Sequence, residues 1–94
     1  MEITVSGMAM RFAAKRGAQI FVWAEPSGLA HVTTSPPPTG GIVQWETTQI
    51  DDLSLFVDDS LQVAWLRIVF RPLPFPHLWA NWPGKWADGG GGGG

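Results

Sequence analysis

The side chains of this sequence that could carry chemistry are two histidines, four paired aspartates and six tryptophans. His31 and His77 are the only imidazoles, and they lie far apart in the chain. A metal site needs at least three converging ligands, and neither histidine has a carboxylate at a short ligand spacing. We therefore expect no metal ligands. A metal carrier that uses histidines and carboxylates in place of thiolates stays as an alternative.

The paired carboxylates Asp51–Asp52 and Asp58–Asp59 do not match the spaced, glycine-containing calcium loop. Aspartate before a strand or a turn usually accepts hydrogen bonds from free backbone amides, so we expect a capping role. No serine lies in a GxSxG motif, and no GK[ST] follows the terminal glycines. The sequence has no cysteine, which excludes disulfides and thiolate ligands. We expect no catalytic residues, no cofactor and no enzyme activity.

Large aromatic side chains gather in a proline-punctuated segment near the C-terminus. Trp79, Trp82 and Trp86 follow Phe75 and Leu78 within a short distance. One interpretation is that these side chains fold back and seal the open face of a small sheet. The other is that they form an aromatic surface for a protein partner or a second copy, because tryptophan anchors interfaces well.

A sugar-stacking surface is a third interpretation of the same segment, with Asn81 and Asp88 as its only polar companions. A second aromatic site comes from residues 18–25, where Phe21 and Trp23 alternate with an equally apolar set. A strand that is apolar on both sides is central or lies at an interface. The predicted partner-binding residues are Phe21, Trp23, Phe75, Leu78, Trp79, Trp82 and Trp86.

The overall charge argues against nucleic acid as a partner. Six Lys and Arg residues stand against eight Asp and Glu residues, and the formal net charge is −2. The basic cluster of Arg11, Lys15 and Arg16 is predicted to be one solvated helix face. No apolar run approaches the roughly 20 residues that span a bilayer, so no membrane partner is expected. The absence of cysteine favours a cytoplasmic location.

The elements that must position these side chains follow from the hydrophobic pattern. Alternating residues predict strands at residues 2–5, 18–25, 29–34 and 42–47. Residues 53–70 predict two more strands joined by a tight connection, with a brief helical turn possible at residues 60–64. Ser6 as N-cap and Gly17 as terminator frame a short helix. A turn is expected at residues 25–28, a proline-rich loop at residues 35–41, and an extended segment at residues 71–77.

These elements predict an α+β, mostly-β domain of about six or seven strands with one short N-terminal helix. We expect a small mixed-β sandwich or barrel. Residues 1–88 form one domain in this interpretation, and residues 89–94 form a flexible glycine tail.

The order of elements resembles the HesB-like family of A-type iron–sulfur carriers. The opening MEITVSGMAMRFAAKRGA is similar to the family's first strand and helix, and AQIFVWAEPSG to the strand before its first cysteine loop. LFVDDSLQ is similar to the family's FVD-x-x-S-L strand and turn, and NWPGKWADGGGGGG to its terminal Cys-Gly-Cys tail. The resemblance covers nearly the whole chain, and LFVDDSL is its most specific part.

The family holds its cluster through three cysteines, and this chain has none of them. The resemblance therefore implies a compact fold that oligomerises, without cluster binding. We expect a non-catalytic protein-interaction or accessory subunit that binds a protein partner or forms a homo-oligomer. The alternative is a protein that binds a small molecule or a metal through Trp, His and carboxylate side chains.

Overall fold

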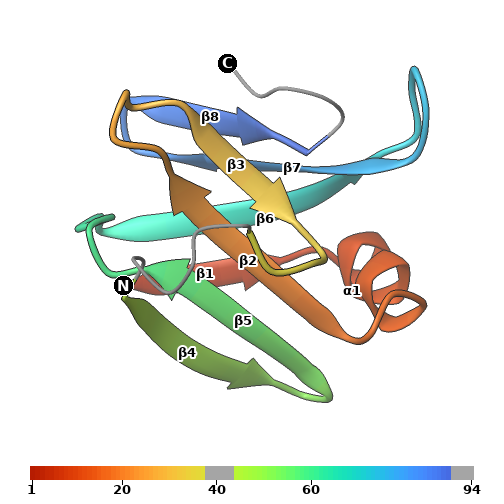
Figure 1. Cartoon of the computed structure of the whole chain (residues 1–94). Coiled ribbons are helices and arrows are strands. Elements are labelled where there is room, and N and C mark those ends of the chain that lie inside the picture. The colour runs from red at the N-terminus through yellow and green to blue at the C-terminus, as the bar shows by residue number, and fades with distance from the viewer. Residues whose placement is uncertain (38–43, 90–94) are drawn as a thin grey trace.

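The computed structural model describes residues 1–37 and 44–89 of the chain (Figure 1). One helix and eight strands make up this described part. They are β1 (Glu2–Val5), α1 (Gly7–Ala14), β2 (Gln19–Ala24), β3 (Ala30–Thr33), β4 (Trp45–Ile50), β5 (Leu53–Asp58), β6 (Trp65–Arg71), β7 (His77–Trp82) and β8 (Lys85–Asp88). The prediction of a mostly-β, α+β domain with one short N-terminal helix is confirmed, with eight strands instead of six or seven.

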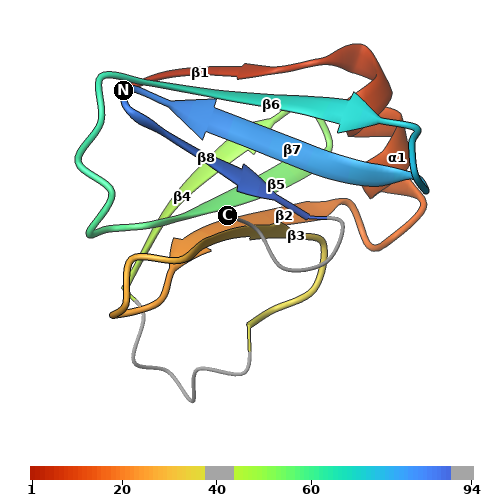
Figure 2. The same ribbon diagram turned by 90° about the horizontal axis from the view of Figure 1, so that it is seen from above.

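The strands form two four-stranded mixed sheets. The first has the order β1-β6-β7-β8, and the second has the order β3-β2-β5-β4. Each sheet contains one parallel pair, β1 with β6 in the first and β2 with β5 in the second. Figure 2 shows the two sheets facing one another, with β3 and β8 side by side where the sheets approach.

Helix α1 begins where the sequence predicts. The Ser6 hydroxyl accepts a hydrogen bond from the Ala9 N–H at 3.1 Å, so Ser6 is the N-cap. The helix ends at Ala14, earlier than the position of Gly17 suggests, and Gly17 follows in the left-handed region with a φ of 94°. The Arg16 guanidinium then donates to the Phe12 carbonyl at 3.2 Å, which satisfies a carbonyl of the last turn.

Two turns in the second sheet form hairpins. The turn at residues 25–28 joins antiparallel β2 and β3, and the Gly28 N–H donates to the Glu25 carbonyl at 2.8 Å. Asp51, with a φ of 53°, lies in the turn between the antiparallel strands β4 and β5. The residue pair next to this turn is Ile50 with Leu53. Strand β4 therefore runs through residues 48–50, beyond the predicted end at residue 47.

Residues 53–70 form two strands, but these strands do not pair with each other. Strand β5 lies in the second sheet and β6 in the first, so residues 59–64 cross from one sheet to the other. These six residues contain turns and no helix, in contrast to the helical turn considered from the sequence.

Residues 77–88 form a hairpin of β7 and β8, which the hydrophobic pattern does not predict. Its turn is Trp82–Pro83–Gly84–Lys85, and Trp82 pairs with Lys85. Proline pre-sets the second turn position, and Gly84 has a φ of 78° at the third, as a type II turn requires.

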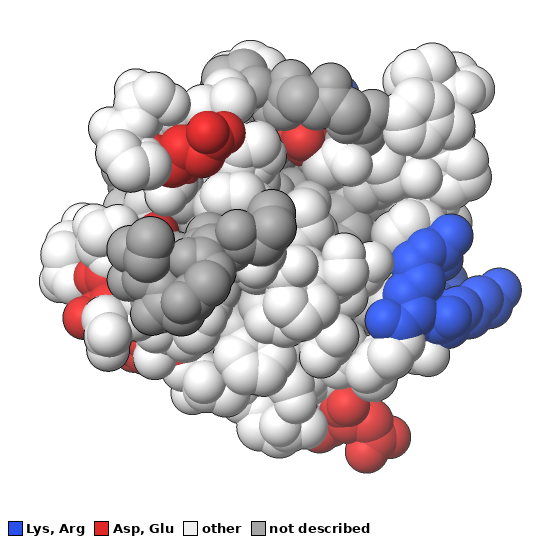
Figure 3. All heavy atoms as spheres, in the orientation of Figure 1, with Lys and Arg blue, Asp and Glu red and all other residues white. Residues whose placement is uncertain are grey.

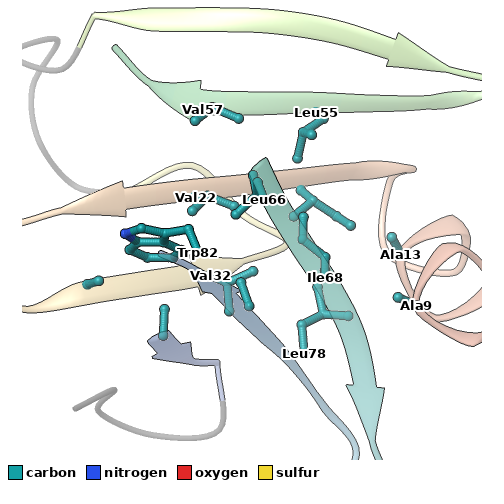
Figure 4. Packing of buried hydrophobic residues seen from close by; sticks show 14 of the residues in the cluster. Ala9, Ala13, Val22, Val32, Leu55, Val57, Leu66, Ile68, Leu78 and Trp82 are labelled. Carbon is teal, nitrogen blue, oxygen red and sulfur yellow. The ribbon is translucent and has the colours of Figure 1, made fainter. Parts of the chain in front are cut away.

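The core lies between the two sheets, with α1 closing one end (Figure 4). Its largest fully buried side chains are Ile20, Leu55, Leu66, Ile68, Val22 and Val32. Trp82 is 4% exposed and lies beside Val22 and Val32 in Figure 4. Ala9 and Ala13 are fully buried, so the helix approaches the sheets through its smallest side chains.

Parts of the predicted loop at residues 35–41, strand at residues 42–47 and glycine tail lie outside the described residues. Gly89 is described and belongs to the folded domain. Its N–H donates to the Leu78 carbonyl at 2.8 Å.

Candidate functional site

The outer face of the β1-β6-β7-β8 sheet carries a set of aromatic and polar side chains. In β6, Trp65, Arg67 and Val69 alternate with the buried Leu66 and Ile68. Residues that pair across strands point to the same side of a sheet. Arg67 pairs with Asn81, Asn81 pairs with Trp86, and Val69 pairs with Trp79. All of these side chains therefore lie on the outer face of the sheet. We call Trp65, Arg67, Trp79, Asn81 and Trp86 the tryptophan face.

The tryptophan face is open to solvent. Trp65 is 38% exposed and Trp86 is 44% exposed, while Trp79 and Asn81 are half-buried. Figure 2 shows that α1 lies at one end of the molecule and not across β6, β7 and β8. An exposed tryptophan leaves a large apolar area in contact with water, and two on one sheet face make this face a candidate binding surface.

A cation–π contact holds part of this face in place. The Arg71 guanidinium carbon lies 4.4 Å from the centre of the Trp79 ring.

The Asn81 Oδ1 atom is shielded from solvent and has no hydrogen-bond partner among the described residues. A shielded acceptor without a donor is costly, and a ligand group that donates to it would remove this cost.

The outer face of the other sheet carries a second aromatic cluster, which is closed. The rings of Phe21 and Phe56 stack with centres 4.6 Å apart, and Trp45 meets Phe21 edge-on at 5.5 Å. Trp23 stacks on His31 with centres 4.2 Å apart. Phe21 is 6% exposed and Trp23 is 9% exposed, so little of either ring is free for a partner in this conformation.

His31 belongs to this closed cluster and is paired with a carboxylate. Its Nε2 atom lies 2.6 Å from Glu25 Oε2. A histidine and a carboxylate can serve as base and orienting group when a nucleophile lies beside the imidazole. The hydroxyl of Thr33, two residues on, donates instead to the Ser35 carbonyl at 2.8 Å.

His77 lies on the first sheet and is held on both sides. Its Nδ1 atom lies 2.6 Å from the Phe75 carbonyl oxygen, and its Nε2 atom lies 3.2 Å from Asp88 Oδ1. These two contacts hold the imidazole ring between the Phe75 carbonyl and Asp88, which indicates a structural role for His77. Within residues 1–37 and 44–89, no three His, Asp or Glu side chains come close enough to hold a metal ion.

The seven predicted partner-binding residues separate into four places. Trp79 and Trp86 lie on the tryptophan face, and Phe21 and Trp23 lie in the closed cluster of the other sheet. Leu78 is 2% exposed and Trp82 is 4% exposed, so both form part of the core. Phe75 is 50% exposed in the loop between β6 and β7.

Trp65 and Arg67 belong to the tryptophan face and are absent from the predicted site. Their alternation with Leu66 and Ile68 already places them opposite the apolar side of the strand. The missing information is the adjacent hairpin of β7 and β8, which brings Asn81 and Trp86 beside Arg67.

The charged side chains are also unevenly placed. Figure 3 shows blue basic atoms gathered over α1, while red acidic atoms lie in several separate places. Arg11, Lys15 and Arg16 are all exposed at this helix and the turn after it. In the described part of the chain, no helix has the length and apolar character needed to cross a membrane.

No protein family, curated protein or solved structure matches this chain in the three comparisons made.

Proposed function

We propose that this protein is a non-catalytic interaction module that binds a protein partner through the tryptophan face. The observation that carries this is the exposure of Trp65 and Trp86, 38% and 44%, on the outside of a four-stranded sheet. Between them, Arg67 and Asn81 are cross-strand neighbours. Tryptophan and arginine are the side chains most often found at the centres of protein interfaces.

The rigidity of this surface supports the same function. Tryptophans on paired strands lose little conformational freedom on binding, and Arg71 is already placed over the Trp79 ring. Because fewer side chains must be ordered, more of the contact energy is available for affinity. The unpartnered Asn81 Oδ1 atom is shielded in this conformation, and a turn of its side chain toward the partner would let it accept a hydrogen bond from a backbone or side-chain donor.

The partner is either a second copy of the chain or another protein to which this chain is an accessory subunit. Glu2 and Arg67 lie on the outer side of neighbouring strands, because Glu2 pairs with Trp65 and Thr4 with Arg67. A face with both charges can meet itself across a two-fold axis, since each sign then has a counterpart on the other copy.

The scaffold is proposed to be a HesB-like domain without cluster ligands, in the cytoplasm. Residues 55–61 carry the most specific part of that resemblance. They run along β5 into the turn after Asp58, which agrees with the strand and turn that the family motif implies.

A small-molecule ligand is the second candidate, and the shielded Asn81 Oδ1 atom favours it. Sugars stack on tryptophan rings and donate hydroxyl groups to amide oxygens. Trp86 and Asn81 are cross-strand neighbours, so one sugar ring could contact both.

The test compares the wild type with a Trp65→Ser, Trp86→Ser double variant and with a control, Leu73→Ser, on another surface. Light scattering across a concentration series measures self-association, and affinity capture on immobilised protein measures binding to another protein. We expect the double variant to lose a complex that the wild type and the control both form. A complex that survives in the double variant, or a wild type that stays monomeric and captures nothing, contradicts the proposed function.

The sugar candidate is tested on the same proteins with a panel of mono- and oligosaccharides, using tryptophan fluorescence. Quenching or a spectral shift that is saturable in the wild type and absent in Asn81→Ala would favour the sugar over the protein partner.

A further inference from the structure

The loop between β6 and β7 exposes two large apolar side chains at its tip. We call residues 72–76 the proline loop, with the sequence Pro-Leu-Pro-Phe-Pro. Leu73 is 77% exposed and Phe75 is 50% exposed. Figure 1 shows the loop extending beyond the sheet that carries it. The fold does not bury these two side chains, so their apolar surface is available to something outside the chain.

The topology places helix α1 beside the proline loop. Strands β1 and β6 are parallel, and Val5 pairs with Ile68, so α1 begins at the end of the sheet where β6 ends. The Phe12 and Phe70 rings lie 5.3 Å apart. Phe12 also lines a hollow of about 230 Å³ together with Pro76. Figures 1 and 2 both place α1 and the proline loop at the same end of the molecule.

This end of the molecule concentrates basic side chains. Four of the six Lys and Arg residues lie there, and all four are exposed: Arg11, Lys15, Arg16 and Arg71. The Arg16 guanidinium carbon lies 3.7 Å from the centre of the Phe12 ring, and Arg71 lies over Trp79 at the base of the loop. These two ring contacts hold the guanidinium groups of Arg16 and Arg71 close to the protein surface at the end that carries the proline loop.

The nearby acidic groups leave this charge largely unbalanced on the loop side. Asp51 and Asp52 line a hollow with Arg11, but Figure 1 places their turn, between β4 and β5, on the far side of α1 from the loop. Asp88, at the base of the loop, contacts His77 and offsets one of the four positive charges. Arg11 thus lies beside the aspartates of that turn, and the exposed Lys15, Arg16 and Arg71 carry the positive charge at the end of the molecule that presents the apolar tip.

The backbone of the proline loop also suits a poorly hydrated environment. Three of its five residues are prolines, which carry no N–H group. The Phe75 carbonyl already has a partner in His77 Nδ1. Because an unpartnered backbone group is costly away from water, a loop with few donors enters an apolar region more easily than an ordinary loop.

We propose that this end of the molecule docks on the surface of an anionic lipid bilayer. Leu73 and Phe75 would enter the interfacial region, while Lys15, Arg16 and Arg71 contact the acidic headgroups. Peripheral binding of this kind combines a small apolar insertion with electrostatic attraction, and each is weak alone. It requires no spanning segment, so the lack of an apolar run long enough to cross a bilayer does not bear on it.

A bilayer fits this end better than a protein groove does. The tip is narrow and carries two apolar side chains, whereas a stable protein interface needs a broad, continuous contact area. The two sites meet at Arg71, which lies over Trp79, but Leu73, Phe75 and Lys15 lie outside the tryptophan face. Loss of protein binding and loss of bilayer binding can therefore be measured independently.

The experiment is co-sedimentation of the full chain with vesicles, either of phosphatidylcholine alone or with about a third phosphatidylglycerol. We expect binding to the anionic vesicles only, and a decrease in binding as salt concentration rises. The apolar variant is Leu73→Ser with Phe75→Ser, and its control is Trp86→Ser on the tryptophan face. We expect the apolar variant to weaken vesicle binding about tenfold or more and the control to leave it unchanged.

The contribution of charge is tested by the variant Lys15→Gln. Its control is Lys85→Gln, which removes one positive charge from the β7–β8 turn instead. Only the first should weaken binding, and circular dichroism verifies that every variant is folded. Equal binding to neutral and anionic vesicles, no binding at all, unchanged binding in the apolar variant, or equal losses from Lys15→Gln and Lys85→Gln would each overturn the proposal. The proposal would also be overturned if the apolar variant lost its binding to a protein partner but kept its binding to vesicles.

Discussion

The Nε2 atom of His77 lies 3.2 Å from the Oδ1 atom of Asp88 and links the start of β7 to the end of β8. The side chain of His77 is only 4% exposed. Its other ring nitrogen lies 2.6 Å from the Phe75 carbonyl oxygen. Both nitrogens thus face oxygen acceptors, and one imidazole fixes the base of the proline loop to the edge of the sheet.

Replacing His77 by Phe keeps a buried ring but removes the contacts to the Phe75 carbonyl and to Asp88. We expect a loss of stability on the order of 1–3 kcal/mol, measured by urea unfolding. Asp88→Asn and the double variant complete a double-mutant cycle, which separates this pair from other interactions of Asp88. Single effects that simply add in the double variant would show that the two side chains are not energetically coupled.

The adjacent aspartates 58 and 59 make a matched test of capping. Asp58 is 7% exposed, and its carboxylate accepts hydrogen bonds from Ala24 N–H at 3.3 Å and from the Ser60 N–H and hydroxyl at 3.0 and 2.8 Å. Asp58→Ala leaves these donors unpaired, so we expect a loss of about 1–3 kcal/mol. Asp59 is exposed, and Asp59→Ala should change the free energy of unfolding by less than about 0.5 kcal/mol. Equal losses in denaturant unfolding would contradict the assignment.

The strands up to β6, the helix start and the first hairpin of this protein could be predicted because each has a local cause. Ser6 caps α1 and residues 25–28 turn the chain, as the sequence indicates. The pairing of strands could not be predicted in the same way. Periodicity tells which side of a strand is apolar, but not which strand lies beside it. The parallel pairs β1 with β6 and β2 with β5 join segments far apart in the chain.

The candidate site illustrates the same limit. Within the aromatic segment, Trp82 is buried and Trp86 is exposed, although both are tryptophans in a proline-rich context. The distinction depends on the turn at Pro83 and Gly84, which makes residues 77–88 a hairpin and sends alternate side chains to opposite faces. The prolines before His77 suggested an irregular segment, and this concealed the period of two.

Gly89 occupies a position with no room for a side chain. A Cβ atom there would lie 2.5 Å from the Val32 carbonyl oxygen and 2.9 Å from that of Leu78. Both obstacles are backbone atoms, so Gly89→Ala must displace β3 or β7, and we expect a loss of about 1–3 kcal/mol. At Gly7, the first residue of α1, a Cβ meets nothing within 4 Å. Gly7→Ala should therefore be neutral or stabilise by up to about 1 kcal/mol. Thermal unfolding compares the two variants, and an unchanged midpoint in Gly89→Ala would disprove the close approach.

Leu55 and Leu73 are the same residue type, one in the core and the other on the surface. Leu55 is fully buried between the sheets, whereas Leu73 is 77% exposed at the tip of the proline loop. Leu55→Ala leaves a cavity in the core and should cost about 2–5 kcal/mol. Leu73→Ala removes no internal contact of comparable size, so the free energy of unfolding should stay within about 0.5 kcal/mol. Urea unfolding without lipid measures both values. A large loss in Leu73→Ala would mean that the loop is packed against the domain in solution, and such a loop could not present Leu73 to a bilayer.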